Sequence, residues 1–432
     1  MYAPEDLVAI QKKTLRTLVS GQIIAAASLA SAVTVGAFVV QDILGADTAW
    51  SGIASATVTI GTAFMAQLLS LVMTRKGRRI GLQYGYIAAF IGGIIAGIGA
   101  ETSQLAVFLF GLFLFGNGQA ANLLSRYAAT DLADVNTRAS AMSRILFAST
   151  FGAVFGPILV VPAERVGESV FGWKQYTGPW IFSACFFVFA AVNVMLRLRP
   201  DPLEVSGGLR SQNVAGVQPP KFRIAMQTIV QSPSAKIAIF AMVVSQVTMV
   251  AVMTMTPVHL KAHGHESVSP FVISLHIAGM YAFSPWVGKY CDRKGRYSAI
   301  AVGSILLISA TVFAALAGES ALLLFPALWL LGVGWSFGLI GGSNLLVDSI
   351  PIESRVHIQG TADFLMSLCG GIAGFSSGFI RRAVGFHMLS NIACVLAFVM
   401  FLVVQKGTKG QSRQFCASFI ATRYRTDHSR QR

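Results

Sequence analysis

The chain has 432 residues, of which 54% are hydrophobic and only 12% are charged, and its mean hydropathy is +0.65. Because a soluble domain carries about 25% charged residues, this chain cannot cover a water-facing surface, and we expect it to lie in a lipid bilayer. Its net charge of +15 would favour nucleic acid as the partner of a soluble protein. Here the basic residues gather in short loops between apolar segments, where they act as topology signals and meet anionic lipid headgroups, so nucleic-acid binding is not expected.

Twelve segments are apolar over the length of about 20 residues that a membrane-spanning helix needs. In chain order they are 17–40, 50–73, 80–99, 104–125, 139–162, 177–197, 236–257, 269–289, 297–317, 320–347, 358–380 and 384–404. This pattern predicts an all-α membrane protein with twelve transmembrane helices. The 42 glycines, many of them inside these segments, are interpreted as sites where helices pack closely.

A basic stretch rich in proline and glycine divides the segments into two sets of six. We interpret it as a cytoplasmic linker with a short surface helix near residues 221–230. The expected organisation is an N-terminal segment 1–16, a first bundle 17–197, the linker 198–235, a second bundle 236–404 and a basic tail 405–432.

The distribution of lysine and arginine predicts the orientation in the membrane. Most of the 33 basic side chains fall in the two ends of the chain, in the linker, and in the loops on the same side of the membrane. The other side holds Arg165, Lys174, Lys261, Arg381 and Arg382. Because positively charged loops stay inside, both chain ends are expected in the cytoplasm, and the short loops favour a bacterial inner membrane.

Two polar loops of the first half recur in the second half. Residues 75–78, Arg-Lys-Gly-Arg, reappear as residues 293–296, which is 218 positions later. An aspartate and an arginine seven residues apart also recur, first at Asp131 and then, 217 positions later, at Asp348. Duplicated membrane units with matching loops are typical of secondary transporters.

Residues 288–296, Gly-Lys-Tyr-Cys-Asp-Arg-Lys-Gly-Arg, resemble the Gly-x-x-x-Asp-Arg-x-Gly-Arg loop signature of the major facilitator superfamily. Their place, between the second and third segments of the second half, also matches that family. The first-half equivalent, residues 70–78, keeps the arginines and the glycine between them but lacks the first glycine and the aspartate. The resemblance covers residues 10–404 and implies the major facilitator fold, with two pseudo-symmetric six-helix bundles.

These loops contain charges that could hold one face of a transporter closed. Gly295 permits a tight turn between antiparallel helices, and Asp292 can pair with a basic group on a neighbouring helix. The repeated charges suggest two halves of one gate, although helix capping and membrane anchoring explain single residues equally well. The gate candidates are Arg75, Gly77, Arg78, Asp131, Arg138, Gly288, Asp292, Arg293, Gly295, Arg296, Asp348 and Arg355.

Gly152, Gly156 and Pro157 in the fifth segment resemble the Gly-x-x-x-Gly-Pro signature of drug:proton antiporters in the same superfamily. Proline removes a backbone hydrogen bond and bends a helix, so these residues are hinge candidates. The fourth helix of such antiporters carries an arginine just before a Gly-x-Gly. Here Leu112 stands at that position and no buried arginine is expected nearby, so the coupling arginine is either missing or replaced by Arg144.

Ionisable residues inside membrane helices are energetically costly and are therefore candidates for proton coupling. Few are found, and the three candidates are Asp363 in the eleventh segment, Arg144 in the fifth and His276 in the eighth. Asp363 either carries the proton or forms an ion pair with a basic residue of a neighbouring helix. A lone histidine such as His276 is more often a packing residue.

The resemblance implies that the first, fourth, seventh and tenth helices line a central cavity. The polar residues near the middle of these helices are uncharged, which favours a neutral, lipophilic or zwitterionic substrate, and each of them also suits helix packing. The cavity candidates are Ser28, Ser31, Thr34, Asn117, Gln119, Asn122, Gln246, Thr248, Trp335 and Asn344.

No cofactor, metal site or disulfide is expected. The five cysteines form no paired motif, and metal binding is the less favoured interpretation of His259, His263 and His265 in one outer loop. The chain has no metalloprotease, serine-hydrolase or phosphate-loop motif, so it is not expected to be an enzyme.

The expected function is secondary active transport of a small molecule by a monomer working through alternating access. Proton-coupled efflux of neutral or lipophilic compounds is the first hypothesis. Proton-coupled uptake of a small metabolite is the alternative, favoured by the missing arginine of the fourth helix. A non-transporting membrane sensor is the remote alternative.

Overall fold

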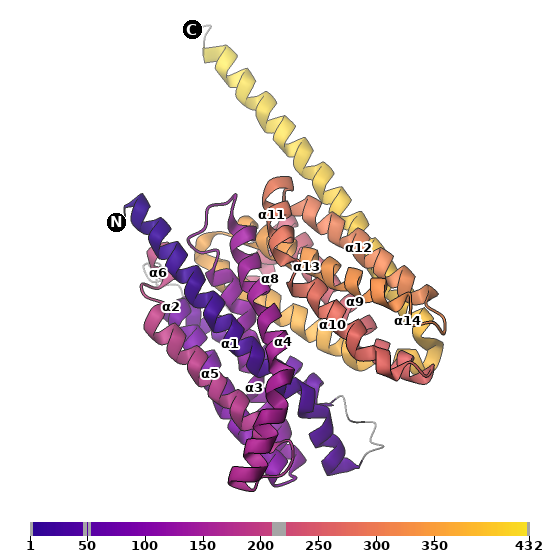
Figure 1. Ribbon diagram of the computed structural model, residues 1–432. Helices are drawn as coiled ribbons and strands as arrows, with labels where there is room; N and C mark the ends of the chain where they lie inside the picture. Colours follow the sequence, from indigo (N-terminus) through magenta and orange to yellow (C-terminus); the bar gives the residue numbers. More distant parts are fainter. Residues whose placement is uncertain (1–2, 46–49, 51–52, 210–221, 430–432) are drawn as a thin grey trace.

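The computed structural model describes residues 3–45, 50, 53–209 and 222–429, without the side chains of residues 4, 30–34, 37, 157, 222, 266 and 409–429. This described part of the chain is helical and contains no β-strand, and nine of its helices are long and apolar enough to cross a membrane. Figure 1 shows two groups of helices, with both chain ends on one side of the molecule. We call that side the terminal face.

Five helices form the first half: α1 (Pro4–Leu44), α2 (Ile53–Glu101), α3 (Leu105–Ala128), α4 (Arg138–Phe171) and α5 (Thr177–Arg197). The helix α2 contains two predicted spans, one on each side of a bend at Gly77. At this bend φ is 89°, a value that only glycine adopts readily. Glycine also lets α2 and α3 pack backbone to backbone. A Cβ atom on Gly116 would lie only 2.6 Å from the backbone nitrogen of Thr62.

Two short helices lie in the described parts of the linker: α6 (Pro202–Val205) and α8 (Phe222–Gln231). α8 lies where the sequence predicts a short helix, while Lys221 and the rest of 210–221 lie outside the described residues. Asp201, just before α6, accepts a 2.7 Å hydrogen bond from the backbone nitrogen of Arg79. The start of the linker is therefore fixed to the bend of α2.

The second half contains α9 (Pro233–Ala262), the 3₁₀ turn η1 (Glu266–Val268), α10 (Ser269–Tyr281), α11 (Ser284–Lys294), α12 (Arg296–Leu316), α13 (Leu324–Ser349) and α14 (Ile352–Ser429). The predicted span 269–289 is divided into α10 and α11. Pro285 lacks the N–H that would bond the carbonyl of Tyr281, and the hydroxyl of Ser284 donates to that carbonyl instead, at 2.6 Å. α14 bends at Gly385, where φ is 85°.

The helices account for the predicted spans. α2 and α14 each supply two spans on either side of a glycine bend, and α10 with α11 supplies one. With α1, the described helices therefore provide all twelve, and the prediction of an all-α fold with two six-helix halves is confirmed.

Each half has its own apolar core, and the two halves exchange a few residues. Ala139 and Leu146 of α4 are buried in the core of the second half. Val347 of α13 and Val356 of α14 are buried in the core of the first half. The exchange involves the start of α4, the end of α13 and the start of α14, so the halves pack against each other near the terminal face.

Candidate functional site

The repeated loops fold alike in the two halves. Gly77 and Gly295 both have φ of 89°, with ψ of 170° and 162°. Each glycine makes the sharp turn between two antiparallel helices and is followed directly by an arginine. The duplication seen in the sequence is therefore also a duplication of backbone geometry.

Each of these arginines binds the aspartate of its own half. Arg78 holds Asp131 through two hydrogen bonds, Nε to Oδ2 at 2.8 Å and Nη2 to Oδ1 at 3.0 Å. Arg296 holds Asp348 at the pseudo-symmetric place, Nε to Oδ2 at 3.0 Å. Asp131 lies in the loop that follows α3, and Asp348 lies at the end of α13. Each arginine–aspartate pair therefore connects the glycine turn to the next polar loop of the same half.

A second set of bonds crosses from one half to the other. Arg138, at the start of α4, donates from Nη1 to Asp348 Oδ1 at 2.8 Å. Arg296 donates from Nη2 to the backbone oxygen of Val135 at 2.5 Å. Asp348 therefore accepts from an arginine of each half.

Asp292 pairs with a basic group of the neighbouring helix, as expected, and it also bonds across the boundary between the halves. Its carboxylate accepts from the backbone nitrogens of Ala139 (3.1 Å) and Ser140 (2.8 Å) at the start of α4, and from Arg296 Nη1 of its own half at 3.0 Å. The first-half equivalent, Thr74, donates to its own helix. Of these two equivalent residues, Asp292 is therefore the one that places a negative charge on the positive end of a helix in the other half.

The remaining gate candidates differ in their surroundings. Arg75 and Arg293 are exposed, and the bonds between the halves described above do not include them. Gly288 packs under α4: a Cβ atom there would lie 2.4 Å from the hydroxyl of Ser143. Arg355 donates weakly to Ile350 O at 3.4 Å, and its Nε has no hydrogen-bond partner among the described residues.

The most deeply buried ion pair joins Arg126 of α3 to Asp363 of α14. Both side chains are 0% exposed, and Nη2 and Oδ1 are 2.5 Å apart. Arg126 also donates to the hydroxyls of Tyr127 (3.2 Å) and Ser343 (3.4 Å). In the described part of the structure Asp363 Oδ2 has no partner. A pair without water depends on both members, because either charge alone would be buried uncompensated.

This pair corrects the sequence analysis. The expectation of no buried arginine near the fourth spanning helix is wrong, because Arg126 lies in the last turn of that helix and is fully buried. An arginine at the end of an apolar segment looks like a loop anchor in the sequence. Only the packing of α13 and α14 over it removes it from water.

The two other coupling candidates lie away from the pair. Arg144 is exposed on α4. His276 is buried within the second half, where its Nδ1 is 2.8 Å from Leu328 O and its Nε2 has no partner among the described residues. Of the three candidates, Asp363 is the one that contacts the opposite half.

A further polar contact between the halves involves residues that the sequence analysis missed. Gln67 of α2 lies between two side chains of α14, with Nε2 3.4 Å from His357 Nδ1 and Oε1 accepting from Thr361 at 3.1 Å. Nearby, Arg78 Nη2 donates to Gln359 Oε1 at 2.8 Å. The signal in the sequence was the run of polar residues at 357, 359, 361 and 363.

The cavity candidates fall into two groups. Trp335 Nε1 donates to Gln246 Oε1 at 2.7 Å, and the ring of Tyr281 meets that of Trp335 edge to face at 5.9 Å. This cluster joins α9, α10 and α13 and combines apolar area with amide groups. Gln119 of α3 is half-buried and stays available as a cavity residue.

The other cavity candidates are engaged in helix packing. Asn117 donates to Leu114 O of its own helix, and Asn122 accepts from Tyr86. Asn344 donates to Ile340 O at 2.8 Å, while its Oδ1 has no partner in the described part. Of the remaining candidates, Ser28 donates to Ser183 O and Thr248 is buried. The side chains of Ser31 and Thr34 lie outside the described part of the structure.

The hinge candidates lie in a helix that is continuous through them. Gly152 packs on α1, where a Cβ atom would lie 2.3 Å from that of Ala26 and 2.6 Å from the nitrogen of Ala27. Gly156 is buried, and the side chain of Pro157 lies outside the description. Close approach of α1 and α4 therefore explains Gly152, and a hinge at these residues stays a prediction.

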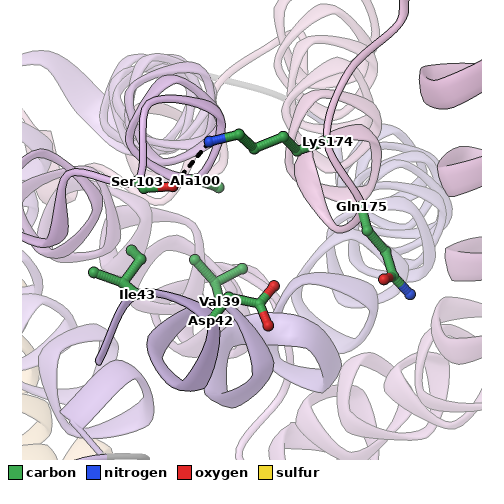
Figure 2. A pocket seen from close by; sticks show the side chains of 7 residues that line it. All are labelled: Val39, Asp42, Ile43, Ala100, Ser103, Lys174 and Gln175. Carbon is green, nitrogen blue, oxygen red and sulfur yellow. Dashed lines mark hydrogen bonds between the residues drawn. The ribbon is translucent and has the colours of Figure 1, made fainter. Parts of the chain in front are cut away.

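The first half also contains a pocket, which lies between the C-terminal ends of α1 and α2. Figure 2 shows Lys174 reaching across it to Ser103, with Nζ and Oγ 2.9 Å apart, and Asp42 and Gln175 at its rim. No cavity candidate lines it. Among the described residues, no group of three or more His, Cys, Asp or Glu side chains is arranged to hold a metal ion.

Comparisons with known proteins agree with this architecture. The protein "Uncharacterized MFS-type transporter YdeG" of Bacillus subtilis (strain 168) is 38% identical over 406 residues, covering 93% of both chains. "Riboflavin transporter RfnT" of Brucella anthropi is 26% identical, covering 93% of this chain and 98% of its own.

The fold is similar to solved transporter structures. The transporter FucP in the outward conformation superposes with a TM-score of 0.72 at 14% identity, covering 90% of this chain and 97% of that chain. The sequence profile described as Major Facilitator Superfamily matches residues 18–378. Together, this match and the 38% identity to a transporter of that type show that the chain is a multi-pass membrane protein of the Major Facilitator Superfamily.

Proposed function

We propose that this protein is a proton-coupled secondary transporter that works as a monomer by alternating access, and that its structure is the state closed at the terminal face. The observation that carries the proposal is the buried Arg126–Asp363 pair, which joins the two halves without contact with water. The Arg138–Asp348 bond and the capping of α4 by Asp292 support the same closed state.

The terminal face is the cytoplasmic face in this proposal. Both chain ends lie on it, and the basic residues of the chain gather on that side, as positively charged loops do. The transporter would then be closed to the cytoplasm and would take up or release its substrate on the other side of a bacterial cell membrane.

Proton transfer to Asp363 would open the gate. When Asp363 is charged, it neutralises Arg126 inside the protein. A neutral Asp363 would leave the arginine as an uncompensated buried charge, and the pair would separate so that water can reach it. Arg126 would in this way perform the role for which the sequence analysis considered Arg144.

The first candidate activity is efflux of neutral or lipophilic compounds. The Trp335–Gln246–Tyr281 cluster supports it, because it offers an aromatic surface and an amide but no charge. Uptake of a small metabolite is the second candidate. It is favoured by the 26% identity to a protein named as a riboflavin transporter, since that name gives a metabolite as substrate.

One experiment separates these candidates. Accumulation of a panel of dyes, antibiotics and vitamins, riboflavin included, would be measured in cells that lack or overproduce the protein, with and without a protonophore. Lower accumulation on overproduction, abolished by the protonophore, supports proton-driven efflux. Higher accumulation of one compound supports uptake. If Asp363→Asn leaves gradient-driven transport unchanged, proton coupling through Asp363 is wrong.

A further inference from the structure

His357 is a titratable side chain buried directly between the two halves. The residue is 2% exposed and lies on α14, five residues from the start of the helix and six before Asp363. Its ring faces Gln67 of α2, at 3.4 Å between Nδ1 and Gln67 Nε2. Like the Arg126–Asp363 pair, this contact exists only while the halves are together at the terminal face.

The surrounding hydrogen bonds suit a neutral imidazole. Gln67 Oε1 accepts from Thr361, so its amide group points its N–H donors at His357. Nδ1 then acts as the acceptor. On the other side of the ring, Nε2 is buried and has no partner among the described residues. Nε2 carries a hydrogen in both the neutral form and the imidazolium, so the two forms differ at Nδ1, where an imidazolium would need an acceptor and the closed interface places an N–H donor.

The nearby charges also disfavour an imidazolium in the closed state. The first half contributes the charged residues Arg78, Arg126 and Asp131 to this interface. The helix α14 itself carries Glu353, Arg355 and Asp363. Asp131 is engaged by Arg78 and Asp363 by Arg126, while Glu353 is exposed. Among the described residues, the acidic side chains of these elements are therefore either paired with an arginine or exposed, so none is free to stabilise an imidazolium within the interface.

We infer that His357 is a second proton-binding residue of the gate, neutral when the terminal face is closed and protonated when it opens to water. This inference rests on the proposed alternating-access function. A histidine in water titrates near pH 6.5. Because only the open state accommodates the proton, acidification from pH 7.5 to 5.5 shifts the equilibrium towards opening by about tenfold per histidine.

The test measures gate opening rather than transport. Ser70 of α2 is fully buried under α14, where its hydroxyl would lie 2.2 Å from a Cβ atom on Gly360. In a variant of the full chain with its five natural cysteines replaced, Ser70→Cys would report opening through its rate of labelling by a maleimide. The protein would be held in nanodiscs at each pH. The same measurement on Arg75→Cys, at an exposed site of the same helix, corrects for the effect of pH on thiol reactivity.

The corrected labelling rate should rise when the pH is lowered from 7.5 to 5.5. The rise in the protein with His357 should be about tenfold larger than the rise in His357→Gln. His276→Gln, at a buried histidine within one half, should keep the full rise. His357→Lys, which carries a charge throughout this range, should label rapidly at both pH values. Coinciding profiles for His357→Gln and the parent would overturn the inference, as would slow labelling of His357→Lys.

This experiment can fail independently of the proposed function. Labelling does not depend on a substrate or a gradient, so an unchanged labelling profile would remove His357 and leave transport untouched. Conversely, if no compound of the panel were transported, the proposed transport function would lose its support, but the labelling rates would not change.

Discussion

Breaking the Arg126–Asp363 pair should open the terminal face. Both side chains are 0% exposed, so Asp363→Asn leaves a buried arginine without its counter-charge. Removing one partner of a buried pair destabilises the state that contains it by about 3–5 kcal/mol. At 1.4 kcal/mol for each factor of ten, this is a shift of roughly 10² to 4 × 10³-fold from the closed towards the open state.

The assay is maleimide labelling of Ser70→Cys at pH 7.5, where the natural cysteines have been replaced. Asp363→Asn and Arg126→Gln should each raise the labelling rate by about two orders of magnitude or more, the upper limit being set by the rate of a fully exposed cysteine. The double variant Arg126→Met with Asp363→Leu removes both charges and should restore slow labelling, because apolar side chains of similar volume replace a buried pair without loss of stability.

Arg144→Gln is the matched control, because it makes the same substitution at an arginine that is exposed on α4. Its labelling rate should equal that of the parent. The reasoning is refuted if Asp363→Asn labels as slowly as the parent, or if the double variant labels as fast as the two single variants.

Three further predictions follow from other contacts. Asp292→Asn should insert normally but weaken closure by about 1–2 kcal/mol, because it removes the negative charge at the start of α4; unchanged labelling and transport would exclude this role. Gly152→Ala should lower stability by about 1–3 kcal/mol in thermal unfolding, because its Cβ would overlap α1, whereas Gly378→Ala, with open space around it, should be neutral; equal losses would contradict the packing argument. Trp335→Phe keeps the aromatic area but loses the bond to Gln246, so substrate affinity should fall by about 0.5–1.5 kcal/mol, and an unchanged dissociation constant would place the substrate elsewhere.

The duplicated loops were predictable because their information is local. Gly77 and Gly295 each lie between an arginine-lysine pair and an arginine, and each chain turns there with the same φ. The pairing of the repeated arginines with the repeated aspartates is also consistent with their positions in the repeat. Membrane helices are equally local, because in lipid each helix must satisfy its own backbone hydrogen bonds.

The site was less predictable because its partners come from different halves. Asp363 was identified as an ionisable residue inside a membrane segment, but its partner is 237 residues away and looked like a loop anchor. His357 was missed because it stands where the predicted eleventh span begins, a position at which a polar side chain is ordinary. Asp292 was identified together with the kind of its partner, a basic group on a neighbouring helix, but its second partner is the end of a helix in the other half, which no side-chain pattern reveals.

The sequence by itself determined the twelve spans, the two halves and the repeated loops, because each depends on hydrophobicity and turn residues within about 25 neighbouring positions. Only the tertiary structure decided which charges leave water. Arg126 and Asp363 become a buried pair, whereas Arg144 stays exposed, because burial depends on which helices of the opposite half cover each side chain. That packing is a non-local property, and it separates the buried pair from the arginine that stays exposed.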